Sequence, residues 1–255
     1  MLAARPIAGG ERRRLQMQED VMTAGTGLRV YPDPADVFIT DQVELAEHLH
    51  PLISIDLAGV DPAWHGWIHL VSPLEPAEGY LGDHTEAFHS PLQRTNWLGF
   101  SMEDDRYRLL GDLRYFARAT TSEELPDPWP GFRTRLDEHC DSEGRSYLAH
   151  RDAFRREGIL LMRHNDGSLR YDESNAMALL EQLGGNADAH DNWVQPELFR
   201  VEYDDDSAWP VSPAGNPFHF VASVPGWHYR RSGADSILLF FEPVERLALL
   251  TFDWS

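Results

Sequence analysis

The sequence predicts an α+β fold made mainly of antiparallel sheet with a few short helices. Short apolar runs bounded by proline, glycine or Asn-Asp steps recur along the chain, which is typical of strands joined by turns. Near the C-terminus, two apolar runs flank Pro243 and predict a buried hairpin near the middle of a sheet. Because the chain has 255 residues, one large domain and two closely packed lobes both remain open.

The first half of the chain is expected to contain strands and one helix. Strands are predicted over four apolar runs with turn residues near their ends: residues 27–31, 51–57, 64–71 and 95–101. Residues 41–50 have helical spacing, and Pro51 is expected to end that helix because proline lacks a backbone donor. Residues 106–118 fit either a bent strand or two short strands.

Residues 123–131 contain Pro126, Pro128 and Pro130, which exclude a helix interior or a central strand. This segment is therefore the predicted boundary between an N-terminal lobe, residues 24–125, and a C-terminal lobe, residues 132–255. Residues 1–23 lack the continuous apolar stretch and cleavage site of a secretory signal, and we interpret them as a flexible leader or an upstream start.

The second half is predicted to alternate helices and hairpins. The elements are, in order, a helix over 146–157, a hairpin of 158–164 with 168–172, a helix over 173–183 and a hairpin of 235–242 with 246–253. Gly158 and the pair Gly184-Gly185 stand where the two helices are expected to end. The tight turn at residues 165–167 is favoured because asparagine and glycine tolerate positive φ angles.

Charge is the strongest compositional signal. The chain has 42 acidic residues against 22 arginines and no lysine, a net charge of −20. This balance disfavours nucleic acid and anionic membranes as partners, because both require a cationic surface, and it favours a cationic partner. The absence of lysine excludes a Schiff-base lysine and a phosphate-loop lysine.

A single cysteine and a polar average composition limit the location of the protein. Cys140 is the only cysteine, so the chain forms no intrachain disulfide and no cysteine-rich zinc site. No apolar run approaches the roughly 20 residues that a membrane span requires. We therefore expect a cytoplasmic protein.

Nearly half of the net charge lies in one stretch. Residues 166–206 contain 11 acidic residues and two arginines, a net charge of −9. Such a concentration can speed the encounter with a cationic protein. The alternative is that it serves only solubility. The triplet Asp204, Asp205 and Asp206 lacks the spaced ligands, glycine and distal glutamate of a calcium loop, so we expect a solvated loop there.

Histidines and the cysteine are the next candidates for chemistry. His48 and His50, His65 and His69, and His84 and His89 form three close pairs in the first half of the chain. His65 and His69 have the spacing of a zinc-protease helix, but Gly66 stands where the general-base glutamate would be. On a strand these two histidines would lie about 13 Å apart, too far to share a metal, whereas on a helix they would be neighbours.

Other enzymatic signals are weak. No family signature surrounds Cys140, and neither a Gly-x-Ser-x-Gly nor a Gly-x-Gly-x-x-Gly motif occurs. We therefore predict no catalytic residue, no metal site and no cofactor. A metal- or small-molecule-dependent enzyme that uses the histidines of the first half remains the alternative.

The C-terminal third has a recognisable order of short motifs: Leu183-Gly184-Gly185, then Asn192-Trp193-Val194-Gln195, then a Pro-x-x-Pro-x-Gly turn between Trp209 and Phe220, then the hairpin around Pro243. This order resembles the YwqG-like family of bacterial proteins. The resemblance implies a mixed α+β fold without established catalytic residues. Some family members carry cysteines around the Pro-x-x-Pro turn; here Ser212 and Ala214 occupy that region, so a structural zinc is not expected.

The resemblance also suggests a use for the acidic stretch, because proteins of this kind occur among immunity proteins that protect bacteria from secreted toxins. We expect a non-enzymatic inhibitor that binds a cationic toxin, a nuclease, in a one-to-one complex. The predicted contact residues are Asp188, Asp191, Trp193, Glu202, Asp204, Asp205, Asp206 and Trp209. The two tryptophans fit an interface or an ordinary core edge. An adaptor without a toxin partner is a third interpretation.

Overall fold

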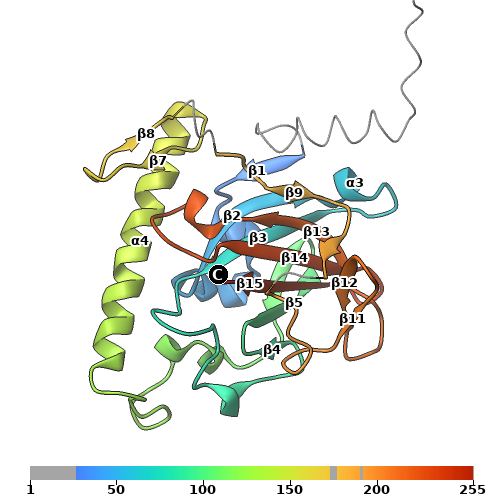
Figure 1. Cartoon of the computed structure of the whole chain (residues 1–255), viewed down its shortest axis with the longest axis horizontal. Helices are drawn as coiled ribbons and strands as arrows, with labels where there is room; N and C mark the ends of the chain where they lie inside the picture. Colours follow the sequence, from blue (N-terminus) through green and yellow to red (C-terminus); the bar gives the residue numbers. More distant parts are fainter. Residues whose placement is uncertain (1–26, 173–176, 190–191, 255) are drawn as a thin grey trace, which may run out of the picture.

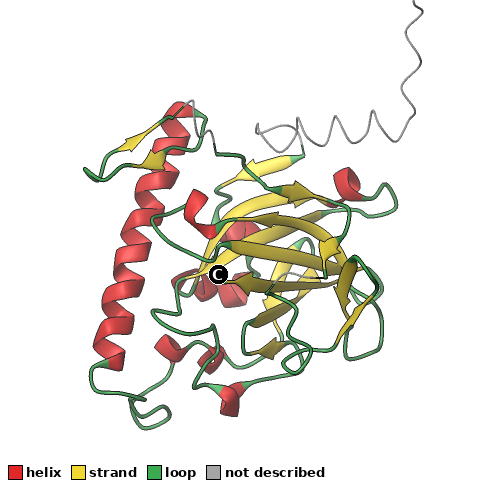
Figure 2. Cartoon of the chain, viewed as in Figure 1, coloured by secondary structure: helices red, strands yellow, loops and turns green. Residues whose placement is uncertain are grey.

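The computed structural model describes residues 27–172, 177–189 and 192–254. Within them the predicted α+β class is confirmed, with strands paired in antiparallel sheets and one long helix at the side (Figures 1 and 2). The predicted leader, residues 1–23, lies outside the described residues. No helix in the described part of the chain is both long enough and apolar enough to cross a bilayer.

The largest sheet has seven strands and carries the buried C-terminal hairpin in its middle. Its strand order is β4-β5-β15-β14-β13-β9, with β6 paired to β5. The strands are β4 (Gln93–Arg94), β5 (Trp97–Glu103), β6 (Arg106–Leu109), β9 (Gln182–Leu183), β13 (His219–Val224), β14 (Ser236–Glu242) and β15 (Leu247–Asp253). The predicted hairpin of 235–242 with 246–253 is therefore confirmed as β14 and β15.

Three smaller sheets complete the strand framework. They are β1 (Leu28–Val30), β2 (Leu49–Asp56) and β3 (Trp67–Pro73); β10 (Ala187–Asp188), β12 (Ser207–Pro210) and β11 (Val201–Tyr203); and the hairpin of β7 (Met162–Arg163) with β8 (Leu169–Arg170). The last of these confirms the predicted turn at residues 165–167, although its strands are shorter than expected.

The large sheet is buried on both faces. Along β14, Ile237, Leu239 and Phe241 belong to the main apolar cluster, while Leu238 and Phe240 belong to a second cluster on the opposite face. Side chains alternate between the two faces of a strand, so each cluster takes every second residue. The second cluster packs the small β10-β12-β11 sheet onto the large one.

The long helix α4 (Phe132–Glu157) is more than twice the length of the predicted helix over 146–157. It begins after Gly131 and ends at Gly158, both in the left-handed conformation, so the predicted cap is confirmed. The buried face of its first half includes Cys140 and Glu143 among apolar residues. This charged residue interrupts the apolar spacing that would have indicated a helix.

Several predictions for the first half of the chain are wrong in detail. The other helices in the described residues are short. They are α2 (Pro34–Val37), α3 (Leu57–Val60) and the 3-10 helices η1 (Thr40–Glu47), η2 (Glu86–Phe88), η3 (Leu113–Tyr115), η4 (Ala117–Ala119) and η6 (Gly226–His228). The helical stretch predicted over 41–50 is η1, and Pro51 does not end it but lies within β2 beside a bulge. Residues 106–118 form one strand followed by η3 and η4, not two strands.

The helix predicted over 173–183 is also wrong where it can be compared. Residues 173–176 lie outside the described residues, and residues 177–183 contain no helical turn. Instead β9 pairs with β13, and the Tyr229 hydroxyl donates to the carbonyl of Leu179 at 2.7 Å. Pairing with a distant strand overrides local helical spacing here.

Strands from both sides of residues 123–131 share one sheet and one core. β5 pairs with β15, and the main apolar cluster includes residues from Leu28 to Phe252. Within the segment itself, Leu125 packs against Phe132 and Leu136 of α4. The boundary between two lobes at residues 123–131, and the choice between one domain and two packed lobes, stay predictions.

Candidate functional site

The predicted acidic surface is the turn between β11 and β12. Asp204, Asp205 and Asp206 are all exposed there, next to Tyr203, whose side chain is 66% exposed. The Asp204 carboxylate accepts hydrogen bonds from the backbone N–H groups of Asp206 and Ser207, at 3.1 and 2.8 Å. Asp204 therefore fixes the turn, while Asp205 and Asp206 extend into solvent.

The remaining predicted carboxylates differ in their surroundings. Glu202 is exposed but pairs with Arg200 at 2.6 Å, so part of its charge is neutralised. Asp188 lies on β10 with its side chain exposed, and its backbone carbonyl accepts a hydrogen bond from the Trp193 indole at 3.1 Å. Asp191 lies outside the described residues.

The two predicted tryptophans have different roles. Trp193 is 0% exposed and packs against Phe240 and Trp97, with ring centroids 5.2 and 6.1 Å away. A partner cannot touch it, so its prediction as a contact residue is wrong; the core-edge interpretation holds. Trp209 is half-buried on β12 and lines a cavity of about 350 Å³ together with Asp204 and His219.

The structure brings His48 and His50 together at a second place, a cavity of about 710 Å³ between α4 and the η1–β2 segment. We call it the histidine cavity; its other lining residues include Arg118, Asp141 and Arg145. His48 stacks on Phe116, and His50 stacks on Tyr147 at a centroid distance of 4.1 Å.

Burial keeps both imidazoles neutral. Desolvation, with a smaller effect of Arg118, lowers the pKa of His48 to about 4. Desolvation and Arg230 hold the pKa of His50 well below its ordinary value. Arg230 Nη1 lies 3.3 Å from Nδ1 of His50, which makes Nδ1 the acceptor and leaves the proton on Nε2. No residue in the described ranges makes a hydrogen bond with either Nε2.

A buried ion pair lies next to His50 of this cavity. Arg230 Nε lies 3.5 Å from Glu143 of α4, and Arg231 lies 3.7 Å from the same carboxylate. Burial lowers the pKa of Arg230 to about 10. Arg230 also donates to the carbonyl of Pro73 at the end of β3. The pair therefore ties α4 to the sheets. The sequence did not indicate this site, because a carboxylate such as Glu143 is rarely expected on the buried face of a helix.

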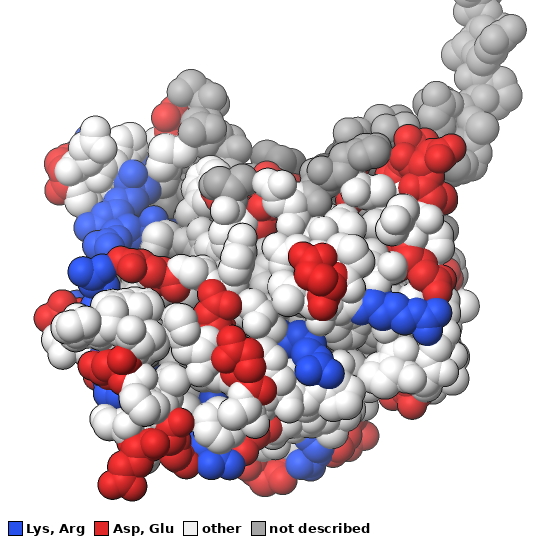
Figure 3. Space-filling view, turned by 60° about the horizontal axis from the view of Figure 1, so that its bottom comes forward, with Lys and Arg blue, Asp and Glu red and all other residues white. Residues whose placement is uncertain are grey.

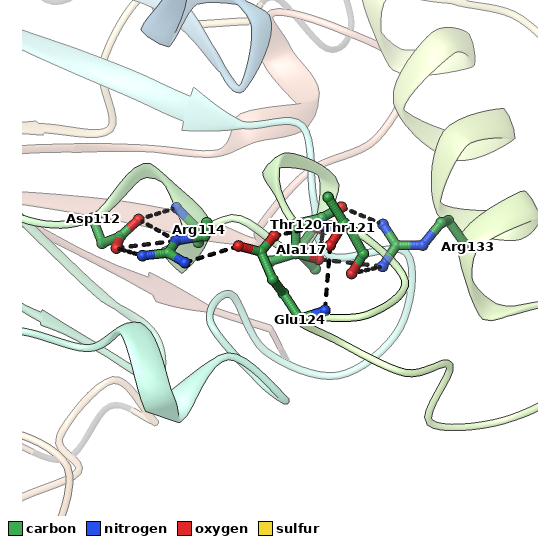
Figure 4. A network of polar contacts seen from close by, with 7 residues as sticks. All are labelled: Asp112, Arg114, Ala117, Thr120, Thr121, Glu124 and Arg133. Atoms are coloured by element: carbon green, nitrogen blue, oxygen red, sulfur yellow. Dashed lines mark hydrogen bonds and ion pairs between the residues drawn. The ribbon is translucent and has the colours of Figure 1, made fainter.

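One wall of the histidine cavity is held in place by polar contacts (Figure 4). Arg114 bridges Asp112 and Glu124, with a distance of 2.8 Å to Glu124. Arg133 of α4 donates to the backbone carbonyl of Thr120 at 2.9 Å. These bonds fix η3 and η4 against α4, and with them the Arg118 side of the cavity.

Glu75 is buried beside this wall. Its carboxylate accepts hydrogen bonds from the backbone N–H groups of Ala117 and Arg118, at 2.8 and 3.3 Å. Desolvation nevertheless raises its pKa to about 7, because two backbone bonds and nearby arginines only partly replace water. Glu75 therefore changes charge near neutral pH.

The other candidates for metal or thiol chemistry do not assemble. His69 is buried in β3, with its ring nitrogens bonded to Ser54 Oγ and the carbonyl of Asp105, while His65 is exposed outside the strand. The described residues contain no group of three or more ligating side chains that could hold a metal. Burial raises the pKa of the Cys140 thiol to about 12, so it is not a nucleophile at neutral pH.

No family model, curated protein or solved structure matches this chain, and the resemblance of its C-terminal third to the YwqG-like family stays a prediction.

Proposed function

We propose that the protein is a non-enzymatic inhibitor of the immunity type, which binds one copy of a cationic bacterial toxin. The β11–β12 turn carries this proposal: three consecutive exposed aspartates project there beside the exposed Tyr203. Carboxylates steer a cationic partner, and an exposed aromatic residue supplies contact area that is lost from solvent on binding.

The charge pattern supports a local contact over a uniform attraction. On the face in Figure 3, acidic side chains form several separate groups with arginines between them. The β11–β12 turn differs because residues 203–209 contain no arginine. Its charge is therefore not cancelled within the turn itself.

A nuclease is the toxin class that this surface fits. A nuclease binds a polyanion, and carboxylates at the right spacing substitute for phosphates. The net charge of −20 and the resemblance to a family with immunity members agree with this class. Such an inhibitor would act in the cytoplasm, on the toxin that arrives there.

The test compares two variants that remove the same charge from different places. In the first, Asp204, Asp205 and Asp206 become Asn. In the second, Asp36→Asn, Glu44→Gln and Glu123→Gln change exposed acids elsewhere. The binding partner in this test is a purified cationic toxin, sought first among the products of the adjacent genes, and stopped-flow mixing measures association. We expect the first variant to associate about tenfold more slowly at low salt and the second to change about twofold or less.

Two outcomes would contradict the proposal. Absence of binding between the two purified proteins would remove the toxin partner. An equal loss in both variants would show that only the total charge matters, not the β11–β12 turn.

A small-molecule function at the histidine cavity is the second candidate. Two neutral imidazoles whose Nε2 atoms have no partner in the described ranges favour it. This is the part of the enzymatic alternative that the geometry supports, since the metal-binding part has no ligand cluster among the described residues. Native mass spectrometry of the purified full chain would reveal a bound molecule, and a His50→Phe variant should lose it.

A further inference from the structure

A cavity of about 400 Å³ lies beside the predicted acidic surface, between the large sheet and the small β10-β12-β11 sheet. We call it the acidic cavity. It is lined by Glu181, Gln182, Asn186, Asp188, Asp206, Phe220, Ser223, Ser236 and Leu238. This lining contains three carboxylates and no arginine, in a chain where most described arginines pair with an acid or with a backbone carbonyl.

The strand register shows which side chains form the floor of the acidic cavity. Ser223 of β13 is the cross-strand partner of both Gln182 of β9 and Leu238 of β14. Directly opposed residues in an antiparallel pair face the same side of the sheet, so these three side chains point the same way. Leu238 belongs to the second apolar cluster, which identifies that side as the one covered by the small sheet.

A serine in this floor is largely buried, and its hydroxyl has no protein partner among the described residues. Ser223 is 8% exposed, and no hydrogen bond to its Oγ occurs among the described residues. Its Oγ is not one of the fully buried side-chain atoms without a partner, so the hydroxyl is open to the cavity, where water or a ligand completes its hydrogen bonds. Ser223 is thus an independent sign that the cavity is built to receive a polar group.

Most of the free polar atoms around the cavity are acceptors. Gln182 Nε2 donates to the carbonyls of Gly184 and Asn186, both at 3.0 Å, and Asn186 Nδ2 donates to Ser207 Oγ at 2.9 Å. These bonds use both amide N–H groups of Gln182 and one of Asn186, and they leave both amide oxygens. The carboxylates of Glu181 and Asp206 likewise have no side-chain partner among the described residues.

A cavity in which the carboxylates of Glu181 and Asp206 and two amide oxygens are available as acceptors fits a cation with many N–H donors. Desolvation raises the pKa of Glu181, so this carboxylate favours a counter-charge when it is ionised. A bare metal ion is a poor occupant, since the described residues hold no group of ligands suited to one. A guanidinium has five N–H donors in a planar fork, and its aliphatic stem can lie on Phe220 and Leu238.

We propose that the acidic cavity receives the guanidinium group of an arginine side chain from the partner protein. The inference rests on the proposed function and names the side chain by which the toxin is anchored. Glu181 and Asp206 bind the guanidinium as charged acceptors, and Ser223 and the amide oxygens complete its hydrogen bonds. A fully desolvated arginine at the centre of an interface is a common hot spot.

The first experiment uses N-acetyl-arginine methylamide as the probe, with the full chain observed by NMR titration. The same compounds made from lysine and from citrulline are the controls, because citrulline keeps the shape and loses the charge. We expect saturable binding of the arginine compound, about fivefold weaker binding of the lysine compound, and none of the citrulline compound. Equal binding of the citrulline compound would overturn the proposal.

The second experiment uses matched variants. The double variant E181Q/D206N should weaken binding of the arginine probe at least about tenfold, while D36N/E44Q, with the same charge change, should leave it unchanged. A melting temperature for each variant confirms that it is folded. Unchanged binding by E181Q/D206N would overturn the proposal. Binding of free arginine far more tightly than of the blocked compound would also overturn it, because the ligand would then be the amino acid and not a protein side chain.

The failures of the two proposals are distinguishable. If the toxin binds E181Q/D206N as tightly as the unchanged protein, the inhibitor function stands and the arginine anchor is lost. If the arginine probe binds in the acidic cavity but no cationic protein partner does, the cavity stands and the inhibitor function is lost.

Discussion

The histidine cavity and the acidic cavity differ in whether nearby carboxylates are paired with arginines. Behind the histidine cavity, the buried carboxylate of Glu143 lies between Arg230 and Arg231. In the acidic cavity, Glu181 and Asp206 have no cationic neighbour among the lining residues. A buried charge is tolerated when an opposite charge lies beside it, whereas unpaired carboxylates survive only where water or a ligand reaches them. The first arrangement holds the fold together, and the second leaves binding capacity.

The same contrast divides the two tryptophans near the acidic surface. Trp193 fills the second core cluster, while Trp209 lies at the rim of a cavity. We expect changes at the buried residues to lower stability and changes at the exposed residues to weaken binding.

The largest effect is expected at Trp193. Trp193→Ala should lower the free energy of unfolding by about 4 kcal/mol, because it removes a fully buried indole and leaves a cavity. Trp209→Ala, at a half-buried position, should cost about 1 kcal/mol and should weaken binding of the partner. Urea denaturation measures both. Equal losses of stability would break the assignment of Trp193 to the core and Trp209 to the surface.

A somewhat smaller effect is expected at the buried ion pair. Glu143→Leu should destabilise the protein by roughly 3 kcal/mol, since it leaves the Arg230 guanidinium buried with no carboxylate. Glu138→Leu, at an exposed position of the same helix, should change stability by about 0.5 kcal/mol or less. The double variant Glu143→Leu/Arg230→Met should recover much of the loss. If the single and double variants are equally unstable, charge pairing is not what Glu143 contributes.

The smallest effect concerns pH. Burial raises the pKa of Glu75 from 4.5 in the unfolded chain to about 7, so the folded state holds this proton more tightly. The resulting stability is fully present below pH 4.5 and is lost as pH rises through 7. Glu75→Gln should remove this dependence, a difference of about 3 kcal/mol between the two proteins across the window.

Urea denaturation at several pH values measures it, and the difference between the two proteins cancels the effect of the overall charge. The same slope in both proteins would mean that folding does not raise the pKa of Glu75. In the acidic direction, neutral buried His48, with a pKa of about 4, makes stability fall as pH drops from 6.5 through 4.

Part of the fold was readable from the sequence because its signals are local. The turn at residues 165–167, the cap at Gly158 and the two apolar runs around Pro243 each depend on a few neighbouring residues, and all three appear in the structure. The acidity of residues 166–206 is likewise a property of composition, and its exposure at Asp204 to Asp206 follows from the cost of burying charge.

What the tertiary structure decided depends on contacts between distant residues. Residues 177–183 have helical spacing, but Gln182–Leu183 pair with β13 and the carbonyl of Leu179 accepts a hydrogen bond from Tyr229. Trp193 stands among acidic residues yet is buried against Phe240. The acidic cavity combines Glu181, Asp206 and Ser223, which meet only when β9, β13 and the small sheet are packed together. Composition and local spacing determine which segments are apolar, which are acidic and which form turns. Which of them share a face is determined by long-range pairing, because side-chain burial depends on the strand opposite and not on the neighbour in sequence.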